Sequence, residues 1–319
     1  MSNQLRWVAA IALCAVQGLA WAQSWPSKPV RVVVPLSAGS NADILARMVA
    51  GRLAAQLGQT FIVENRTGGA GVIGVGYVAK SEPDGYTVLV HTSSFTVTPV
   101  TNSNLPYDTA RDFAGITPLG VVPLVMIIAP SKGLRTVQEV VAAAKAKPGS
   151  MNYASAGSAG QLSSERFRIS AGFEGVHIPF KGTPEAVTEV LTGRVDTYFC
   201  PVTPCLSYIK EGKLLALAAS SSKRSSVLPD VPTTLEAGFP NSNYNFWTGM
   251  FVPAKTPRNV VDKLYQETVK ALQTAEVRER LTKLGTEPMP LTPEQFDKLI
   301  REELAANAAL VKAAGIQGN

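Results

Sequence analysis

Two short segments of small, polar residues could bind an anionic group. They are 37–41, which reads SAGSN, and 155–161, which reads SAGSAGQ. Each follows a run expected to form a strand and precedes a run expected to form a helix. Small residues let backbone N–H groups approach a ligand closely, and a helix N-terminus adds the positive end of its dipole. If the two segments face each other, they form a clamp for an anion; the alternative is that each is only a strand-to-helix connection.

The second segment also comes close to the nucleophile elbow G-x-S-x-G of serine hydrolases. Ser158 would be the nucleophile, but Ala156 stands where the first glycine belongs. The histidine that follows, His177, lies in the apolar run 175–180, where we expect a core histidine with its hydrogen bonds satisfied. Both features count against a hydrolase. A secreted α/β serine hydrolase that uses Ser158 is nevertheless kept as the rival hypothesis.

Motifs for cofactors and metals are weak. The run 69–74 (GAGVIG) matches the dinucleotide-binding pattern G-x-G-x-x-G, which needs an acidic residue about 20 positions further on. Residues 91–94 (HTSS) provide none, so we expect a glycine-rich loop that packs a helix N-terminus. The chain has two histidines, His91 and His177, and no C-x-x-C or H-E-x-x-H motif. We therefore expect no metal site and no cofactor.

The first 22 residues have the pattern of a secretory signal peptide. Arg6 is followed by the apolar run 7–16 and then by AWA at 20–22, a small-x-small pattern that signal peptidase cleaves. The apolar run is too short to cross about 30 Å of hydrocarbon. We expect export, cleavage after Ala22 and a mature chain that starts at Gln23.

Export would leave two cysteines, Cys200 and Cys205, because Cys14 would depart with the signal peptide. In an oxidising compartment, a disulfide between them is one outcome. Two prolines stiffen the CPVTPC segment, and a disulfide needs a Cα separation of about 4.4–6.8 Å. Two free thiols are the other outcome, and the sequence leaves both open.

The composition is that of a globular protein. The chain has 319 residues, which suggests about two domains. Hydrophobic residues make up 45% and charged residues 17%, unlike a disordered chain. The net charge is +6, but the basic residues are scattered and the densest cluster is Lys223-Arg224. We therefore expect no nucleic-acid-binding surface.

Strands and helices are expected to alternate along the chain. Val30–Val34 is rich in β-branched residues and reads as a buried strand, and the helix after it is expected to end at Gly58. Thr136 and Glu139 form a capping-box pattern, and the last helix is expected to end near Gly315. Further strands are expected at 61–63, 87–90, 123–129, 152–154, 175–180, 197–199 and 214–219. This order predicts an α/β fold with mostly parallel sheets.

A series of longer motifs carries a family resemblance. In chain order they are VENRTGGAGVIG at 63–74, PDGYT at 83–87, KPG at 147–149, NYAS at 152–155, PFKG at 179–182, LTGRVD at 191–196 and LPDVPT at 228–233. Together they resemble the tripartite tricarboxylate transporter receptors, the Bug or TctC-type periplasmic binding proteins. The resemblance extends from about residue 29 to about residue 257, with C-terminal helices that fit by pattern.

The resemblance implies a two-lobed periplasmic binding protein, type II-like, without catalytic activity. Each lobe would be a mostly parallel sheet flanked by helices, and two crossover strands, near 123–129 and 245–252, would join the lobes. The chain would divide into a signal peptide at 1–22, lobe 1 at 23–124 and 248–319, and lobe 2 at 125–247. Such a receptor would act in the periplasm as a monomer. It would deliver a small organic carboxylate (di-, tricarboxylate or aromatic) to membrane permease subunits, or alternatively signal to a sensor kinase.

The resemblance also implies the binding residues. Family members hold one ligand carboxylate with two loops that match 37–41 and 155–161, and they line the pocket from regions that match 92–95 and 181–183. The predicted ligand-binding residues are Ser37, Ala38, Gly39, Ser40, Asn41, Thr92, Ser93, Ser94, Ser155, Gly157, Ser158, Ala159, Gly160, Lys181, Gly182 and Thr183.

Two departures from the family pattern bear on the ligand. The first loop of the family often carries Gly-Gly followed by Thr-Asp, whereas 38–43 reads AGSNAD and places Ala42 where the threonine often occurs. Cys200 stands where the family often has an acidic residue. Without that carboxylate to pair with an ammonium group, we expect a plain carboxylate ligand rather than an amino acid.

Overall fold

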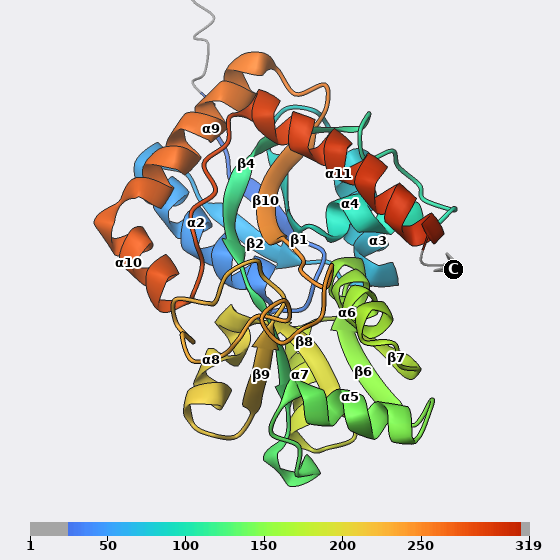
Figure 1. Cartoon of the computed structure of the whole chain (residues 1–319). Coiled ribbons are helices and arrows are strands. Elements are labelled where there is room, and N and C mark those ends of the chain that lie inside the picture. Colours follow the sequence, from blue (N-terminus) through green and yellow to red (C-terminus); the bar gives the residue numbers. More distant parts are fainter. Residues whose placement is uncertain (1–24, 314–319) are drawn as a thin grey trace, which may run out of the picture.

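The computed structural model describes residues 25–313. The expected signal peptide, its cleavage after Ala22 and the helix end near Gly315 lie outside these residues. The described chain forms two lobes, one above the other in Figure 1, and each lobe is built around its own five-stranded sheet. No helix within residues 25–313 combines the length and the apolar character needed to cross a bilayer. The expected two-lobed α/β architecture is confirmed.

Ten strands make up the two sheets of the described chain. The first sheet has the order β2-β1-β3-β10-β4, with β1 (Val30–Val34), β2 (Phe61–Asn65), β3 (Thr87–Thr92), β4 (Phe113–Val122) and β10 (Phe246–Pro253). The second has the order β7-β6-β8-β5-β9, with β5 (Leu124–Ile128), β6 (Met151–Ala156), β7 (Gly175–Phe180), β8 (Thr197–Pro201) and β9 (Leu215–Ala219). Each strand expected from the sequence is present, and β4 is an addition to them.

Both sheets are mixed, and in each of them four of the five strands run in the same direction, as expected for mostly parallel sheets. In the first sheet, β1 pairs in parallel with β2 and β3, whereas β10 is antiparallel to β3 and β4. In the second, β6 pairs in parallel with β7 and β8, whereas β5 is antiparallel to β8 and β9. In each sheet, the strand that arrives from the other lobe is inserted between two strands of the opposite direction. That inserted strand accounts for both antiparallel pairs.

The chain passes between the lobes twice. The first passage is at Pro123, between the end of β4 and the start of β5. The second is the segment 220–245, which joins β9 to β10. The boundary expected after residue 124 therefore falls at the start of β5, and the boundary expected after residue 247 falls inside β10.

Helices cover both faces of the first sheet because its strands bury alternate residues on opposite sides. Val32 and Val34 of β1 pack with α2 (Asn41–Leu57), α9 (Arg258–Gln273) and α10 (Ala275–Lys283). Val33 packs on the other face with α3 (Val72–Ala79), α4 (Ser94–Thr101) and α11 (Pro293–Ala313). A 3-10 turn, η1 (Gly69–Gly71), precedes α3.

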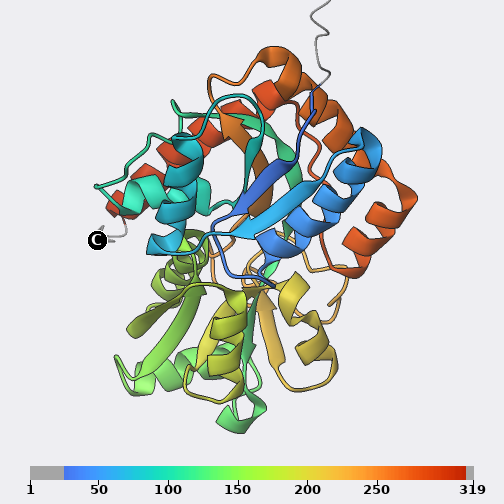
Figure 2. The same ribbon diagram turned by 180° about the vertical axis from the view of Figure 1, so that it is seen from behind.

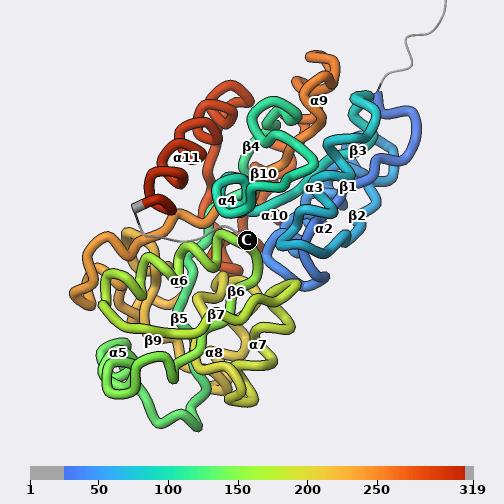
Figure 3. The backbone as a smooth tube through the Cα atoms, turned by 90° about the vertical axis from the view of Figure 1, so that its right-hand side faces the viewer, coloured from blue at the N-terminus to red at the C-terminus, as the bar shows by residue number. Residues whose placement is uncertain are grey.

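The second sheet carries α5 (Val137–Ala146), α6 (Ser158–Ala171), α7 (Thr183–Leu191) and α8 (Val202–Lys210), with a 3-10 turn η2 (Pro130–Lys132) after β5. Its core is one continuous cluster that also includes Val97 of α4, so the two lobes pack against each other. In the side view of Figure 3, α6 of the second lobe lies directly beneath α4 of the first. This is the boundary at which the clamp residues lie.

Local sequence signals act as expected at several element ends. Thr136 and Glu139 form a complete capping box at the start of α5. Gly58 ends α2 in a left-handed conformation with φ of +68°. The run 69–74 packs the start of α3, where a side chain on Gly74 would lie 2.7 Å from the backbone oxygen of Arg66. The glycine is therefore needed for close packing.

Candidate ligand-binding site

The first clamp loop (37–41) links the end of β1 to the start of α2. Seen from behind in Figure 2, β1 runs down toward the second lobe and its loop lies at the boundary between the lobes. Ser40 is the N-cap of α2, and its hydroxyl accepts the N–H of Asp43 at 3.4 Å. The side chain of Asn41 donates to the hydroxyl of Thr248 in β10 at 2.9 Å. The Oδ1 atom of Asn41 is buried without a hydrogen-bond partner among the described residues.

Asp43 organises this loop from inside α2. Its carboxylate accepts the N–H of Gly39 at 2.9 Å, the side-chain amide of Asn65 at 2.9 Å and the guanidinium of Arg47 at 3.0 Å. Burial would raise the pKa of Asp43, but these hydrogen bonds outweigh it and hold the pKa below its ordinary value of 3.8. Because Gly39 donates to Asp43, its N–H is engaged within the loop. The amides of Asn41 and Ala42 in the first turn of α2 have no acceptor within the helix.

The second clamp loop (155–161) links β6 to α6. Gly157 is the N-cap of α6 with φ of +80°, and a side chain there would lie 2.8 Å from the hydroxyl oxygen of Ser94. The N–H of Ala159 donates to the Ser94 hydroxyl at 3.1 Å. The hydroxyl of Ser158 lies 2.8 Å from that of Thr98 and also donates to the backbone oxygen of Ser94 at 3.3 Å. The start of α6 is therefore bonded to α4 across the lobe boundary.

The predicted residues at 92–94 supply part of this contact from the first lobe. Thr92, Ser93 and Ser94 are all fully buried at the end of β3 and the start of α4. The Ser93 hydroxyl accepts from the hydroxyl of Tyr244 at 3.2 Å. Ser94 and Thr98 are four residues apart and so lie on one face of α4. That face is the one that meets α6.

Half-buried Glu303 of α11 holds α4 in place behind this contact. Its carboxylate accepts from Thr96 Oγ1 at 2.8 Å and from the indole N–H of Trp247 at 2.9 Å. Burial raises the pKa of Glu303, although both hydrogen bonds favour its charged form. The C-terminal helix thus fixes both α4 and β10, the two elements that carry Ser94 and Thr248.

The fourth predicted segment, 181–183, approaches the first clamp loop from the second lobe. A side chain on Gly182 would lie 2.5 Å from Cβ of Ser37, so glycine is required there. Ser37 donates its hydroxyl to Glu185 at 2.6 Å. The Thr183 hydroxyl lies 3.3 Å from that of Tyr198, and Lys181 is exposed at the edge. The Ser37 hydroxyl is therefore engaged by Glu185 in this arrangement.

All four predicted segments meet at the boundary between the lobes. A side chain on Gly157 would also contact Leu36 at 3.8 Å, and one on Gly39 would contact Pro184 at 3.4 Å. Most of the predicted residues are buried; Ala38, Gly39 and Lys181 are exposed, and Ser37 is half-buried. The donors gathered here are hydroxyls, amides and two helix N-termini, an arrangement suited to a negatively charged group.

His177 is half-buried at the sheet edge, which corrects its assignment to the core. Its Nε2 atom lies 2.7 Å from the hydroxyl of Ser155, and its ring stacks on Tyr153 with centroids 5.5 Å apart. Burial holds the pKa of His177 below its ordinary value of 6.5. Ser158, the nucleophile of the rival hydrolase hypothesis, hydrogen-bonds to Thr98 and Ser94 rather than to a histidine.

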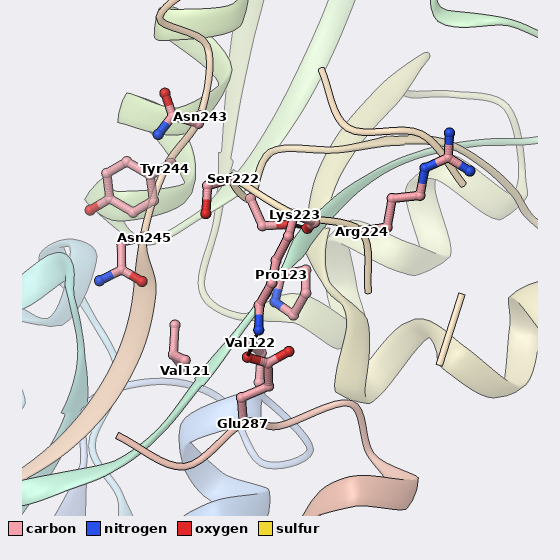
Figure 4. Close-up of a pocket in the computed structure, with 11 residues that line it drawn as sticks. Val121, Val122, Pro123, Ser222, Lys223, Arg224, Asn243, Tyr244, Asn245 and Glu287 are labelled. Atoms are coloured by element: carbon pink, nitrogen blue, oxygen red, sulfur yellow. Dashed lines mark hydrogen bonds and ion pairs between the residues drawn. The ribbon is translucent and has the colours of Figure 1, made fainter. Parts of the chain in front are cut away.

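A separate cavity of about 150 Å³ lies at the hinge, lined by 121–123, 221–224, 243–245 and Glu287. In Figure 4 the side chain of Lys223 reaches Glu287, while Arg224 points away from the cavity. The Lys223–Glu287 ion pair has an N–O distance of 2.8 Å. Glu287 is bonded to β4 through two backbone hydrogen bonds with Val121, whereas Lys223 follows β9. The pair therefore joins one lobe to the other.

Cys200 and Cys205 are joined by a disulfide in the structure, with Cα atoms 6.7 Å apart. Both side chains are fully buried between β8 and α8. Among residues 25–313, no group of three or more His, Cys, Asp or Glu side chains could hold a metal ion.

Sequence reasoning missed several residues that shape the site. Asp43 lies three residues after the Ser40 cap, a spacing typical of a side chain that bonds back to its loop. Thr98 lies one turn after Ser94, so helical periodicity could have placed it on the same face. Glu185 and Thr248 carry no such local signal, because their contacts with Ser37 and Asn41 join segments far apart in the chain.

The chain matches the family model of the tripartite tricarboxylate transporter family receptor, TctC, over residues 45–316. It is 34% identical over 309 residues to protein BugT of Bordetella pertussis, with 96% of this chain and 95% of that protein covered. It is similar to an R. palustris protein solved with adipate, with a TM-score of 0.88, 30% identity and coverage of 92% and 99%. It is also similar to MatC of Rhodopseudomonas palustris with bound malate, with a TM-score of 0.86, 30% identity and coverage of 90% and 100%.

Proposed function

Because the chain belongs to the tripartite tricarboxylate transporter family of receptors, we propose that it is an extracytoplasmic receptor for a small dicarboxylate. In this proposal the acid is held between the lobes, and one of its carboxylates lies between the N-termini of α2 and α6. The loaded receptor then delivers the acid to the membrane permease subunits of a tripartite transporter.

The observation that carries the proposal is the gathering of neutral donors from both lobes at one buried boundary. Ser158 and Ala159 start α6 in the second lobe, and Ser94 and Thr98 face them from the first. In this arrangement the donors of Ser158 and Ala159 are bonded to α4, and a carboxylate would take the place of these acceptors, bound by hydroxyls, by backbone amides and by the helix dipoles. Hydrogen bonds to a charged acceptor are the stronger ones, so this set can hold an anion without a lysine or arginine in contact.

The first clamp loop supports a narrower assignment of its donors. Gly39 is bonded to Asp43, so we assign the contact with the carboxylate to the amides of Asn41 and Ala42 instead. The unpartnered atom of the Asn41 side chain among the described residues is the acceptor Oδ1, so it would accept from a donor elsewhere on the ligand, such as a hydroxyl, and would not contact the carboxylate. The Ser40 hydroxyl caps α2 and is a weaker candidate for the ligand.

The class of ligand follows from chemistry shared by the two similar structures. Adipate and malate both carry two carboxylates, and the proteins solved with them have the fold of this chain. Cys200 is fully buried in a disulfide, at the position where the family often has an acidic residue. No carboxylate is therefore offered there to an ammonium group, which favours a plain dicarboxylate over an amino acid.

Binding measurements test the proposal directly. Calorimetry with malate, adipate, citrate, benzoate and aspartate should find binding for at least one dicarboxylate and weaker or no binding for aspartate. Mass spectrometry of the natively purified protein should release the same class of acid. Absence of binding for every acid, or hydrolysis of a nitrophenyl ester that disappears in Ser158→Ala, would overturn the receptor assignment in favour of the rival hydrolase.

The proposal includes export to the periplasm by a signal peptide at 1–22, with cleavage after Ala22. Amino-terminal sequencing of the periplasmic protein should then begin at Gln23. An exported protein that retains Arg6 would contradict this. The receptor is proposed to act as a monomer with permease subunits; a role with a sensor kinase would instead be supported if the loaded protein bound such a kinase and not the permease.

A further inference from the structure

His177 contacts the second clamp loop through a single hydroxyl. It lies on β7 at the edge of the second sheet, and its Nε2 atom is 2.7 Å from the hydroxyl oxygen of Ser155. Ser155 is in β6 at the start of the loop and is 2% exposed. Because the two strands are paired in parallel, with Tyr153 opposite His177, the imidazole and Ser155 lie on the same face of the sheet.

The direction of the Ser155 hydroxyl depends on which imidazole nitrogen carries a proton. A serine hydroxyl has one hydrogen to donate. When Nε2 is unprotonated, it accepts that hydrogen, and the Ser155 oxygen turns its lone pairs toward the clamp. When Nε2 carries a proton, it donates to Ser155, and the hydroxyl hydrogen is free to point at an acceptor. A carboxylate accepts hydrogen bonds and is repelled by lone pairs. Its binding is therefore favoured when Nε2 carries a proton and opposed when Nε2 is unprotonated.

We propose that His177 is a positioning residue of the carboxylate site, which acts through Ser155 by setting whether that hydroxyl donates to the bound acid. This inference rests on the proposed carboxylate-binding function and adds to it a dependence on pH. It also gives a role to His177, for which the sequence predicted only a place in the core.

The groups around His177 determine the sign of the pH effect. Its ring stacks on Tyr153, whose hydroxyl donates to Glu165 of α6, and Glu165 pairs with Arg168 at 2.8 Å. Burial lowers the pKa of His177 below 6.5, while the nearby charge of Glu165 opposes this in part. His177 is therefore neutral at neutral pH when the site holds no anion, and the proposal assigns its single proton to Nδ1, so that Nε2 accepts from Ser155 in this state. A bound carboxylate raises its pKa, and by linkage the acid binds more tightly as the pH falls.

Calorimetry on three variants tests whether His177 acts on the bound acid through the Ser155 hydroxyl. The affinity for malate, or for adipate if it binds more tightly, is measured from about pH 5.5 to about pH 8 for wild type, His177→Gln, Ser155→Ala and the double variant. Wild type should bind about tenfold more tightly at the lower pH, the effect of one hydrogen bond to a charged group. His177→Gln keeps an amide donor near the Nε2 position, so it should bind as the low-pH form does and with a flat profile.

Ser155→Ala provides the matched control because it removes the hydroxyl through which His177 acts. Its affinity should be about tenfold below the wild-type low-pH value, and it should vary little with pH. Adding His177→Gln to Ser155→Ala should not change the affinity further, since both substitutions act on the same interaction between His177, Ser155 and the acid. The acid's own titration affects all four proteins equally, so the comparison between their profiles isolates the histidine.

Nitrogen-15 spectra of the histidine side chains give an independent measurement on the intact protein. The chain has two histidines, and burial lowers the pKa of His91 to about 3, so His91 stays neutral throughout and serves as the internal reference. The His177 signals should titrate, and saturating malate or adipate should shift their midpoint to higher pH. The same acid should leave that midpoint nearly unchanged in Ser155→Ala.

The outcomes separate this inference from the proposed function. Tight binding of a dicarboxylate with the same pH profile in wild type and His177→Gln would overturn the role of His177 and leave the receptor assignment standing. A pH dependence that persists in Ser155→Ala would equally overturn the route through Ser155. If no acid binds at any pH, the proposed function itself fails, and this inference fails with it.

Discussion

The hydroxyl of Ser158, in the second lobe, lies 2.8 Å from the hydroxyl of Thr98, in the first. Both side chains are buried, and Ser158 begins α6 while Thr98 lies in α4. The pair is therefore a direct polar contact across the boundary where the ligand is proposed to bind. Its strength should influence how readily the lobes remain together around an acid.

Thr98→Val should weaken dicarboxylate binding by about fivefold, because it removes one neutral hydrogen bond of about 1 kcal/mol between the lobes. Thr98→Ser keeps the hydroxyl and should bind like wild type. Thr101→Val is the matched control on the same helix, since the Thr101 hydroxyl bonds only within α4, to the backbone oxygens of Val97 and Thr98. Calorimetry on the three variants checks the order, and equal losses in the Thr98 and Thr101 variants would contradict it.

Asp43→Asn should reduce the free energy of unfolding at neutral pH by about 1–3 kcal/mol, because Asp43 holds Gly39, Asn65 and Arg47 together. The pKa of Asp43 is lowered in the folded state, so its stabilising effect is present above the unfolded-state value near 3.8. This contribution is lost as the pH falls through the folded-state pKa. Urea denaturation should therefore show a gap between wild type and variant at pH 7 that closes in acid.

Asp262→Asn is the control for that experiment. Asp262 forms a similar i,i+4 pair with Arg258, but both side chains are well exposed. An exposed pair contributes about 0–1 kcal/mol, so this variant should unfold close to wild type at both pH values. A loss as large as that of Asp43→Asn would show that any aspartate–arginine pair has this effect and would refute the special role of the first clamp loop.

The disulfide between Cys200 and Cys205 should make the purified protein two protons lighter than its reduced form, with no thiol open to alkylation at these two positions after denaturation. Closing so short a loop restricts the unfolded chain, and reduction should lower the free energy of unfolding by about 2 kcal/mol. Two thiols that alkylate freely without a reductant would exclude the bridge. Dicarboxylate binding by the reduced protein should persist, because both cysteines pack in the core of the second lobe.

Removing the ion pair between Lys223 and Glu287 at the hinge should have a small effect on dicarboxylate affinity, and this effect should depend on salt concentration. Lys223→Ala should change dicarboxylate affinity by less than about fivefold, because Lys223 and Glu287 are 72% and 33% exposed. The difference from wild type should shrink at high salt. The exchanged pair Lys223→Glu with Glu287→Lys should restore wild-type affinity. A larger loss of affinity that does not change with salt concentration would mean that the hinge cavity binds the acid itself.

The local elements could be predicted because their signals lie within a few residues. The β-branched run at Val30–Val34, the capping box at Thr136 and Glu139, and the two small-residue loops each depend on neighbouring positions. The motifs that resemble the receptor family then placed 92–94 and 181–183 beside those loops. The structure brings these four segments together at the lobe boundary.

The remaining features depend on contacts between distant segments. The N–H of Gly39 is engaged by Asp43 and the Ser37 hydroxyl by Glu185, and only the folded loop reveals that these donors are already in use. The mixed sheets arise because β5 and β10 are inserted from the other lobe, a property of topology that hydrophobic patterns do not record. His177 was placed in the core because its neighbours are apolar, whereas β7 is an edge strand.

The affinity of Ser158→Asp for a dicarboxylate tests the central claim most directly. If the acid lies at the N-terminus of α6, the new carboxylate is within about 4 Å of it, and at an effective dielectric near 20 the repulsion is on the order of 4 kcal/mol. The account predicts roughly a thousandfold loss of affinity for malate or adipate, and a smaller loss for Ser158→Ala, which removes only the hydroxyl's hydrogen bond to the acid. Wild-type affinity in a correctly folded Ser158→Asp protein would contradict a carboxylate site between these lobes.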